Sequence, residues 1–318
     1  MLCNYYEIIE LYQKIAPLVK DLSVLNEIHD YVGDAYRLTG HFDKAYEFYH
    51  RVIESVKEKD RIQKCFFPMY NYLDLKYVQG YIQEAKSNIE QILAKLEPEA
   101  GLYKLCYANR LLGNIVYQSG ENDKARDYYK TTYEYAKASN RPLTQAETLE
   151  SIAKTYVGMD NEEAMRLNGQ ARDIAERYRF NRIYAKTYYP EATVYLDEER
   201  YGEALECALI GEKLNKDINY LTGTARMRRY VARAYLGLGE YEKAIEYATM
   251  SVNGYKTNAS YPISRMKSYI VLLQAAKALG KTKEYASVDS LDDIYYQEFP
   301  NADQYIQTIQ ALLSDDGN

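Results

Sequence analysis

Apolar and small residues recur along the chain at intervals that fit pairs of amphipathic helices. Residues 232–248, ARAYLGLGEYEKAIEYA, place apolar side chains three and four positions apart on both sides of Gly239. That spacing puts them on one face of an α-helix. The same offsets return in residues 33–49, 113–129 and 192–208. The pattern therefore predicts helical hairpins that repeat through the chain.

An alanine in the second helix of each hairpin keeps an almost constant spacing. It recurs at steps of 40, 40, 39, 40 and 40 residues, as Ala45, Ala85, Ala125, Ala164, Ala204 and Ala244. A side chain this small suits a position where two close-packed helices approach each other, so we expect these alanines at helix crossings. The first helix has small residues at the facing position, namely Gly33, Gly113, Ala153, Ala192 and Ala232.

The turn inside each hairpin has its own signature. Gly40, Gly120 and Gly239 follow the first helix, and glycine adopts the left-handed conformation that ends a helix without steric cost. An acidic residue three positions later favours the N-terminus of the second helix. These acidic residues are Asp43, Asp123 and Glu242. Because one hairpin cannot bury its apolar face alone, neighbouring hairpins must stack.

These residues resemble the tetratricopeptide repeat family. Its order of small residue, aromatic, turn glycine, alanine and aromatic is matched by Gly33, Tyr36, Gly40, Ala45 and Tyr49. The likeness covers roughly residues 23–280 and implies an all-α fold, a right-handed α-solenoid superhelix of stacked helix-turn-helix repeats. The chain departs from the family in lacking its tryptophan and in a period near 40 residues rather than about 34. The longer repeats resemble kinesin light chain repeats and bacterial regulators with peptide-sensing repeat domains.

We predict that residues 1–318 form a single domain. Residues 23–294 should contain about seven hairpins, beginning with helices at roughly 23–39, 43–59, 62–79 and 82–96. Residues 299–318 are predicted to form a C-terminal capping helix and tail. Residues 1–22 fit either a lone capping helix or the second helix of a repeat whose first helix lies before Met1, and both alternatives stay open.

Composition and charge narrow the classes of partner. The net charge is −6, which favours neither nucleic acid nor an anionic membrane. No segment approaches the 18 or more apolar residues that a membrane helix needs, so we expect no membrane insertion. The four cysteines are far apart without a CxxC motif, which is typical of a reducing compartment. We expect a cytoplasmic protein, unless an upstream leader is missing from the sequence.

No motif indicates an enzyme, a cofactor or a metal. The chain has no phosphate-binding glycine loop, no nucleophile elbow and no paired carboxylates in a supporting context. The three histidines, His29, His41 and His50, show no HxxxH or HExxH spacing and are expected to be solvated or hydrogen-bonded. The sequence therefore predicts no catalytic residue, no metal ligand and no cofactor.

The predicted inner surface of the first helices changes its charge along the array. Its N-terminal end is acidic, with Glu27, Asp30, Asp34 and Asp74. The remainder is polar or basic, with Arg110, Asn114, Lys154, Lys186, Tyr189, Arg226, Arg229 and Arg233. Arg226, Arg229 and Arg233 are spaced i, i+3 and i+7 and so share one helical face.

These positions predict a groove for an extended ligand. Arginine forks in it would bind ligand carboxylates. The alternative is a solvated helix face, either with its arginines free in solvent or with them paired to Glu199 or Glu203 of the neighbouring repeat. Which of the two applies depends on the partners of Arg226, Arg229 and Arg233.

The predicted function is a non-catalytic protein- or peptide-binding module, because stacked repeats offer a preformed concave surface. By resemblance, it is the sensor or scaffold part of a bacterial signalling or regulatory system. The alternative is a structural assembly adaptor or a homodimerising scaffold that uses the convex face and the ends.

Overall fold

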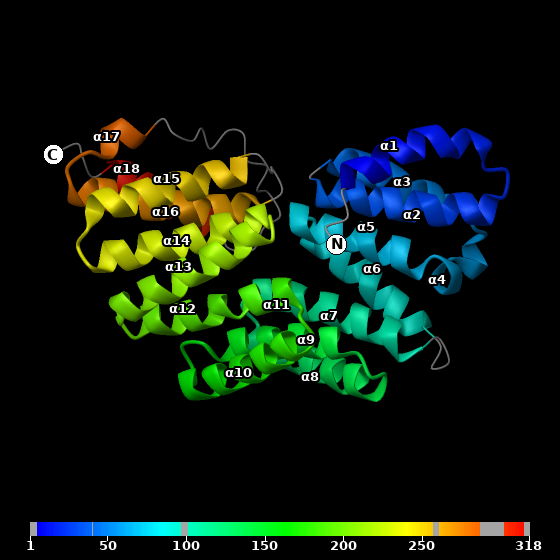
Figure 1. The fold of residues 1–318 in the computed structure, drawn as a ribbon, viewed down its shortest axis with the longest axis horizontal. Helices are drawn as coiled ribbons and strands as arrows, with labels where there is room; N and C mark the ends of the chain where they lie inside the picture. The colour runs from blue at the N-terminus through cyan, green and yellow to red at the C-terminus, as the bar shows by residue number, and fades with distance from the viewer. Residues whose placement is uncertain (1–4, 40, 97–100, 257–260, 287–301, 315–318) are drawn as a thin grey trace. The chain divides into compact units, whose positions relative to one another are not determined.

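The computed structural model describes all residues except 1–4, 40, 97–100, 257–260, 287–301 and 315–318. Every regular element among the described residues is a helix (Figure 1). The chain divides into two compact units, residues 1–112 and 113–318, where the sequence pattern had suggested one continuous domain. Each unit is a stack of antiparallel helical hairpins.

Unit 1 holds the first helices of the array. They are α1 (Tyr5–Ile15), η1 (Ala16–Leu18), α2 (Leu22–Leu38), α3 (Phe42–Ser55), η2 (Glu58–Asp60), α4 (Arg61–Lys64), α5 (Phe66–Gln79), α6 (Ile82–Lys95) and the start of α7 (Leu102–Gln118). Helix α1 packs on the first hairpin, since the ring of Tyr12 lies 5.8 Å from that of His29 and 5.1 Å from that of Phe48. The Tyr12 hydroxyl lies 3.3 Å from His29 Nε2, which agrees with the expectation that this histidine is hydrogen-bonded.

Unit 2 holds the rest of α7 and the helices that follow. They are α8 (Asn122–Ala138), α9 (Pro142–Tyr156), α10 (Asn161–Arg177), α11 (Asn181–Lys186), α12 (Tyr188–Asp197), α13 (Tyr201–Asp217), α14 (Leu221–Gly237), α15 (Tyr241–Lys256), α16 (Pro262–Ala278), α17 (Thr282–Tyr285) and α18 (Ala302–Ser314). Helix α18 packs on α16 and buries Ile309 against it. The predicted end of the last hairpin, residues 287–294, lies outside the described residues.

The recurring alanines lie in the core, as their register predicts. Ala45, Ala85, Ala125, Ala164, Ala204 and Ala244 each have an exposed fraction of 0%. Where the first helix has glycine instead, a tyrosine ring fills the space. A Cβ added to Gly33 would lie 2.7 Å from Tyr49, and one added to Gly113 would lie 2.5 Å from Tyr129. The two helices of these hairpins therefore pack through an aromatic ring that tolerates only glycine opposite it.

Left-handed residues end several of the first helices. Gly120 and Gly239 have φ of 82° and 76°, which confirms the predicted helix ends there; Gly40 lies outside the described residues. Some second helices end without glycine. Asn140 and Asn219, with φ of 49° and 53°, take the left-handed conformation that asparagine tolerates better than most residues.

Two first helices are broken, contrary to the continuous helix predicted over residues 62–79. The breaks lie at Cys65, three residues before Pro68, and at Thr187, three residues before Pro190. Proline lacks the N–H that its turn of helix needs, and its ring clashes with the carbonyl four residues earlier. Helix α3 also ends at Ser55 instead of near residue 59, and a 3-10 turn follows it.

Enlarging a crossing alanine should destabilise the fold. Ala125→Leu and Ala244→Leu insert a branched side chain where no exposed surface remains, so each should lower the free energy of unfolding by about 1–3 kcal/mol. Urea denaturation followed by circular dichroism measures this. The matched control is Ala138→Leu at the exposed end of α8, which should unfold like the wild type. If the two core variants unfold like this control, the proposed register of the crossings is wrong.

Candidate functional site

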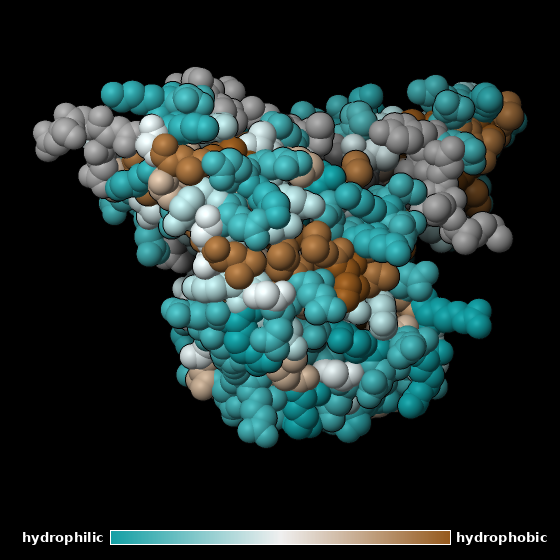
Figure 2. Space-filling model, turned by 60° about the vertical axis from the view of Figure 1, so that its left-hand side comes forward, coloured by the Kyte–Doolittle hydropathy of each residue, from teal (hydrophilic) through white to brown (hydrophobic). Residues whose placement is uncertain are grey.

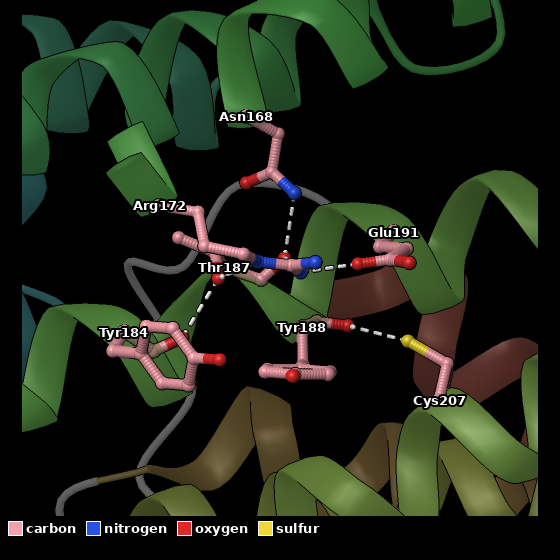
Figure 3. Close-up of polar contacts among 7 residues, drawn as sticks. All are labelled: Asn168, Arg172, Tyr184, Thr187, Tyr188, Glu191 and Cys207. Atoms are coloured by element: carbon pink, nitrogen blue, oxygen red, sulfur yellow. Dashed lines mark hydrogen bonds and ion pairs between the residues drawn. The ribbon is translucent and has the colours of Figure 1, made fainter. Parts of the chain in front are cut away.

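A polar network holds the break between α11 and α12 (Figure 3). The carbonyl of Thr187 accepts a hydrogen bond from Asn168 Nδ2 at 2.7 Å and one from Arg172 Nη2 at 3.4 Å. Arg172 Nε also donates to the Thr187 hydroxyl at 3.0 Å, and the same guanidinium forms an ion pair with Glu191. Helix α10 thereby supplies donors to a segment whose own helix is interrupted by Pro190.

The neighbouring helix α13 contributes to the same joint. Cys207 Sγ donates to the carbonyl of Tyr188 at 3.6 Å, and the guanidinium of Arg172 lies 4.4 Å from the Tyr188 ring centre. These contacts fix the backbone on both sides of the break. Lys186 and Tyr189 flank it, so the direction of both side chains is set by the joint.

Helices α9, α11, α12 and α14 form one surface of unit 2. Helix α12 contacts both α9 and α14, and α11 contacts α9. Six cationic side chains belong to it: Lys154, Arg182, Lys186, Arg226, Arg229 and Arg233. Three tyrosines lie among them, namely Tyr189, Tyr220 and Tyr230. We call these nine residues the basic face.

Several of the cations stack on the tyrosines. The guanidinium of Arg182 lies 4.7 Å from the Tyr220 ring centre, and that of Arg226 lies 5.0 Å from that of Tyr189. Both distances are typical of cation–π contacts. The rings of Tyr189 and Tyr230 are themselves stacked at 6.5 Å. Aromatic surface and positive charge therefore alternate across the basic face.

The three arginines predicted to share one helical face differ in their surroundings. Arg229 is buried, donates to the carbonyl of Ser264 at 3.1 Å and lies 5.6 Å from the Tyr230 ring centre. Arg226 is half-buried and Arg233 is exposed. Arg229 thus has a backbone partner on the next hairpin, whereas Arg226 contacts the Tyr189 ring and Arg233 is exposed to solvent.

Most of the basic face lacks carboxylate partners. Among the described residues, Arg182, Lys186, Arg226, Arg229 and Arg233 form no ion pair with a carboxylate. The cations at the helix joints behave differently, because each pairs with a neighbouring acid: Arg172 with Glu191, and Arg228 with Glu212 at 2.9 Å. Lys154 is the exception on the basic face, with its Nζ 3.1 Å from Glu150 Oε2.

Among the described residues, no ion pair joins the arginines of the basic face to Glu199 or Glu203, and the choice between a ligand groove and a solvated helix face remains open. Glu203 binds Arg200 of its own turn. Glu199 has a left-handed backbone with φ of 56° between α12 and α13, and no ion pair joins it to the basic face among the described residues. Acids in the turn pair within three residues, which is the separation that brings side chains together on a helix.

The side chains of the basic face differ in exposure, from Arg182 and Arg233, which are exposed, to Tyr189 and Arg229, which are buried. Burial lowers the pKa of Lys186 even though that side chain is only half-buried. Burial likewise raises the pKa of Tyr117 on α7 to about 12, with further contributions from Tyr230 and Glu150. Tyr117 and Tyr230 belong to helices several hairpins apart within unit 2, so their side chains converge from different repeats.

Two buried polar groups next to the basic face lack hydrogen bonds. Glu150 has an exposed fraction of only 1%; its Oε2 forms the ion pair with Lys154, whereas its Oε1 has no hydrogen-bond partner. The hydroxyl of Tyr255, also 1% exposed, has none either, and this ring faces Arg226 and Tyr189. An unsatisfied buried polar group costs about 1–3 kcal/mol, which a ligand that binds these groups would recover.

The predicted groove residues of α7 are engaged within their own units. In unit 1, Arg110 Nη2 donates to the Tyr70 hydroxyl at 3.2 Å, and its guanidinium lies 5.0 Å from the Tyr107 ring centre. In unit 2, Asn114 Oδ1 accepts from the Tyr129 hydroxyl at 2.9 Å. Their assignment to a ligand groove remains a prediction.

The predicted acidic end belongs to unit 1 and is an internal network. Asp34 Oδ1 accepts from the Tyr49 hydroxyl at 2.6 Å and from Asn71 Nδ2 at 3.1 Å. Arg37 joins this network to the second hairpin. Its Nε lies 3.5 Å from Asp34 Oδ1, and its Nη1 lies 3.7 Å from Asp74 Oδ2. Glu27 is exposed.

Asp30 lies beside this network without completing it. Its Oδ1 is buried and has no hydrogen-bond partner. Burial and the negative charge of Asp34 raise the pKa of Asp30 to about 7, against the opposing charge of Arg37. The carboxyl group of Asp30 is therefore partly protonated at neutral pH.

Unit 1 also has a surface pocket of about 500 Å³ between α3 and α5. It is lined by Tyr46, Glu47, His50, Arg51, Tyr72 and Lys76. Its charges are already balanced: Lys76 pairs with Glu84 at 3.3 Å, and Arg51 with Glu47 at 3.7 Å. The pocket therefore offers a ligand less uncompensated charge than the basic face does.

The sequence pattern missed Arg182, Tyr220 and Tyr230. Arg182 stands four residues before Lys186, a spacing that places both on one side of a helix and would have pointed to it. Tyr220 precedes α14 in a turn, where helical periodicity gives no information. Tyr230 stands four residues after Arg226 on α14, a spacing that places both on one side of the helix and would have pointed to it; its stacking on Tyr189 depends on the packing of α12 against α14.

The described part of the chain contains no cluster of three or more His, Cys, Asp or Glu residues suited to a metal ion. Within the same residues, no helix combines the length and the apolar character needed to cross a membrane. Cys65, Cys106 and Cys207 are buried and form no disulfide among the described residues.

Comparison with known proteins identifies the fold through solved structures. No protein-family model matches the chain, and no curated protein sequence matches it. The structure is similar to a Rap protein complexed with Competence and Sporulation Factor, with a TM-score of 0.65 and 14% identity over 92% of this chain and 85% of that chain. It is also similar to NprR in complex with its cognate peptide NprX, with a TM-score of 0.56 and 16% identity over 88% of this chain and 81% of that chain. A third similar structure is aspartyl phosphate phosphatase F from Bacillus subtilis, with a TM-score of 0.54 and 15% identity over 92% of this chain and 79% of that chain. At these identities, the likeness establishes an all-α helical-repeat solenoid.

Removing Arg172 should loosen the joint between α11 and α12. Arg172→Gln leaves Glu191 without its cation and Thr187 with fewer donors, so the free energy of unfolding should fall by about 1.5–3 kcal/mol. Urea denaturation measures the loss. Arg166→Gln is the matched control, because Arg166 is exposed on the same helix and pairs only with Glu163; it should cost less than about 1 kcal/mol. Equal losses in the two variants would contradict a special role for the joint.

Ionisation of Asp30 should oppose folding. Because its pKa is higher in the folded than in the unfolded chain, the folded state retains a proton that the unfolded state has lost, and this contribution to stability falls as the pH rises from about 4 to about 7. Asp30→Asn cannot ionise, so its stability relative to wild type should grow over that range by roughly 1–3 kcal/mol and then level off.

Urea denaturation at several pH values measures the effect of Asp30. The control is Glu90→Gln, at an exposed position of unit 1, which should show no such trend. A constant stability difference between Asp30→Asn and wild type at all pH values would contradict the raised pKa.

Proposed function

We propose that this protein is a non-catalytic sensor or scaffold of a regulatory system, and that it binds a peptide or protein segment bearing carboxylate groups on the basic face of unit 2. The observation that carries the proposal is the set of cations without carboxylate partners, namely Arg182, Lys186, Arg226, Arg229 and Arg233. The net charge of the chain is −6, so a cluster of cations on one surface is opposite in sign to the chain as a whole. Such a local positive charge attracts an anionic ligand.

The tyrosines suit a peptide rather than a simple inorganic anion. The half-buried ring of Tyr230 stacks on the buried ring of Tyr189, over which the guanidinium of Arg226 lies, and tyrosine combines a large apolar surface with a polar hydroxyl. Glu150 Oε1 and the Tyr255 hydroxyl are buried polar groups without hydrogen bonds next to the cations, while Glu150 Oε2 is paired with Lys154. A peptide has carboxylates, amides and apolar side chains that match these three kinds of group.

The similar solved structures support the choice of ligand class. Two of them were determined as complexes, one with Competence and Sporulation Factor and one with the peptide NprX. A third bears the name of an aspartyl phosphate phosphatase. The fold is therefore one on which signalling peptides are bound in other proteins, and the uncompensated cations suggest where this chain would bind one.

Replacing two of the available arginines should weaken binding. We expect the double variant Arg226→Gln, Arg233→Gln to bind acidic peptides about ten- to a few hundred-fold less tightly than wild type, since a hydrogen bond to a charged group contributes about 1.5–3 kcal/mol and neighbouring sites are not additive. An array of synthetic acidic peptides selects the probe, and calorimetric titration at two salt concentrations measures its affinity. The difference should shrink at high salt, which screens exposed charges.

The control for this test is the double variant Arg166→Gln, Arg177→Gln on the second helix α10, which removes the same charge away from the basic face. It should retain the wild-type affinity. If the basic-face variant also retains it, binding takes place elsewhere and the outer surface becomes the working surface. Leu209 and Ile210 of α13 are 36% and 41% exposed, and Figure 2 shows hydrophobic residues gathered in a band on a largely hydrophilic face.

A further inference from the structure

The pocket between α3 and α5 of unit 1 has aromatic walls that are held in place. The ring centres of Tyr46 and Tyr72 lie 5.1 Å apart, with their planes at 68°. The hydroxyl of Tyr46 donates to Gln79 Oε1 at 2.5 Å, which fixes this ring against α5. Both tyrosines are half-buried, so each ring is packed on the protein and still reaches the pocket that it lines.

The ammonium group of Lys76 is anchored beside these walls. Its Nζ lies 5.4 Å from the ring centre of Tyr46 and 5.8 Å from that of Tyr72. It lies closest to the ring centre of Tyr81, at 4.2 Å. All three distances allow attraction between a cation and a ring, and the ion pair with Glu84 at 3.3 Å adds a further contact. The position of a cation over the rings is therefore already occupied.

The rim of the pocket on α3 has hydrogen-bond donors that the protein uses little. His50 and Arg51 line the pocket and are exposed, and His50 forms no hydrogen bond or ion pair among the described residues. Arg51 meets Glu47 only at 3.7 Å, which is beyond hydrogen-bond length. Exposed ion pairs of this kind contribute little stability, so the guanidinium can exchange this partner for another anion.

The lining favours an aromatic anion over other small ligands. It contains the cations Arg51 and Lys76 but a single acid, Glu47. A ligand cation would be repelled by Lys76 at the place where the rings would attract it. A flat ring, in contrast, can pack on the tyrosines. The volume of about 500 Å³ and the combination of aromatic walls with a few polar groups are typical of small-molecule sites.

We propose that this pocket binds a small molecule with an aromatic ring and one carboxylate group. The ring packs against Tyr46 and Tyr72, and the carboxylate accepts hydrogen bonds from Arg51 and His50. The side chain of Glu47 is 64% exposed, so it turns into solvent when the ligand carboxylate takes its place. The pocket belongs to unit 1 and the basic face to unit 2, so the inference goes beyond the proposed function and does not rest on it.

Three probes separate the contribution of the ring from that of the charge. Indole-3-propionate should bind wild-type protein with a dissociation constant on the order of 1 mM, since a ligand of this size gains limited affinity per atom. Indole-3-propionamide lacks the charge and cyclohexanepropionate lacks the aromatic ring, so each should bind more weakly. Saturation-transfer NMR of the probe measures all three. If either analogue binds as tightly as indole-3-propionate, the proposed ligand class is wrong.

Substitutions in the pocket test its location. Arg51→Gln should weaken indole-3-propionate about threefold to tenfold, because a contact with an exposed charge is lost. Tyr72→Leu should also weaken it, because one aromatic wall is lost, and circular dichroism verifies that this variant is folded. The matched control is Lys44→Gln, which removes an exposed cation of the same helix outside the pocket and should bind like wild type. Wild-type affinity in Arg51→Gln overturns the proposal.

The two proposals can fail separately. The basic-face variant Arg226→Gln, Arg233→Gln should bind indole-3-propionate like wild type. If this variant weakens the probe and Arg51→Gln does not, the probe binds the basic face, and the pocket proposal falls while the proposed function stands. If Arg51→Gln weakens the probe while acidic peptides bind the basic-face variant as tightly as wild type, the pocket proposal stands and the proposed function falls.

Discussion

The close approach of two helix backbones in each hairpin is the constraint on which the structure depends. It requires a side chain no larger than alanine at one position of the second helix, and the six alanines that occupy it are fully buried. On the first helix, Gly33 and Gly113 leave room for the rings of Tyr49 and Tyr129. Since six hairpins obey the same constraint, the first helices of neighbouring hairpins within each unit can place their side chains on a shared surface.

Two prolines modify this regular arrangement. Pro68 and Pro190 interrupt the first helix of a hairpin in each unit, and the freed backbone groups need new partners. At Thr187 these partners are Asn168 and Arg172 of the preceding helix. A local cost in helix hydrogen bonding is thus offset by contacts between repeats, and the same contacts orient Lys186 and Tyr189 toward the basic face.

The arginines at the helix joints differ from those of the basic face in their ion pairs. Arg172 and Arg228 meet Glu191 and Glu212 at the joints between helices, where an unpaired buried charge would be costly. On the basic face, Arg226 and Arg233 form no ion pair with a carboxylate within the described residues, although the charge of Asp197 acts on Arg233. The cations of the joints and those of the basic face therefore differ in how closely a carboxylate approaches them.

The repeat, the buried alanines and the glycine helix ends follow from the sequence, because each depends on residue size or backbone conformation within some forty residues. The shared face of Arg226, Arg229 and Arg233 also follows from helical spacing. Their partners do not, because a partner lies on another helix: the tertiary structure placed Arg229 against Ser264 and left Glu203 with Arg200. It also brought Tyr220 from a turn and Arg182 from a broken helix to one point. Local periodicity determines which face a residue occupies, but only packing between repeats decides what stands opposite it.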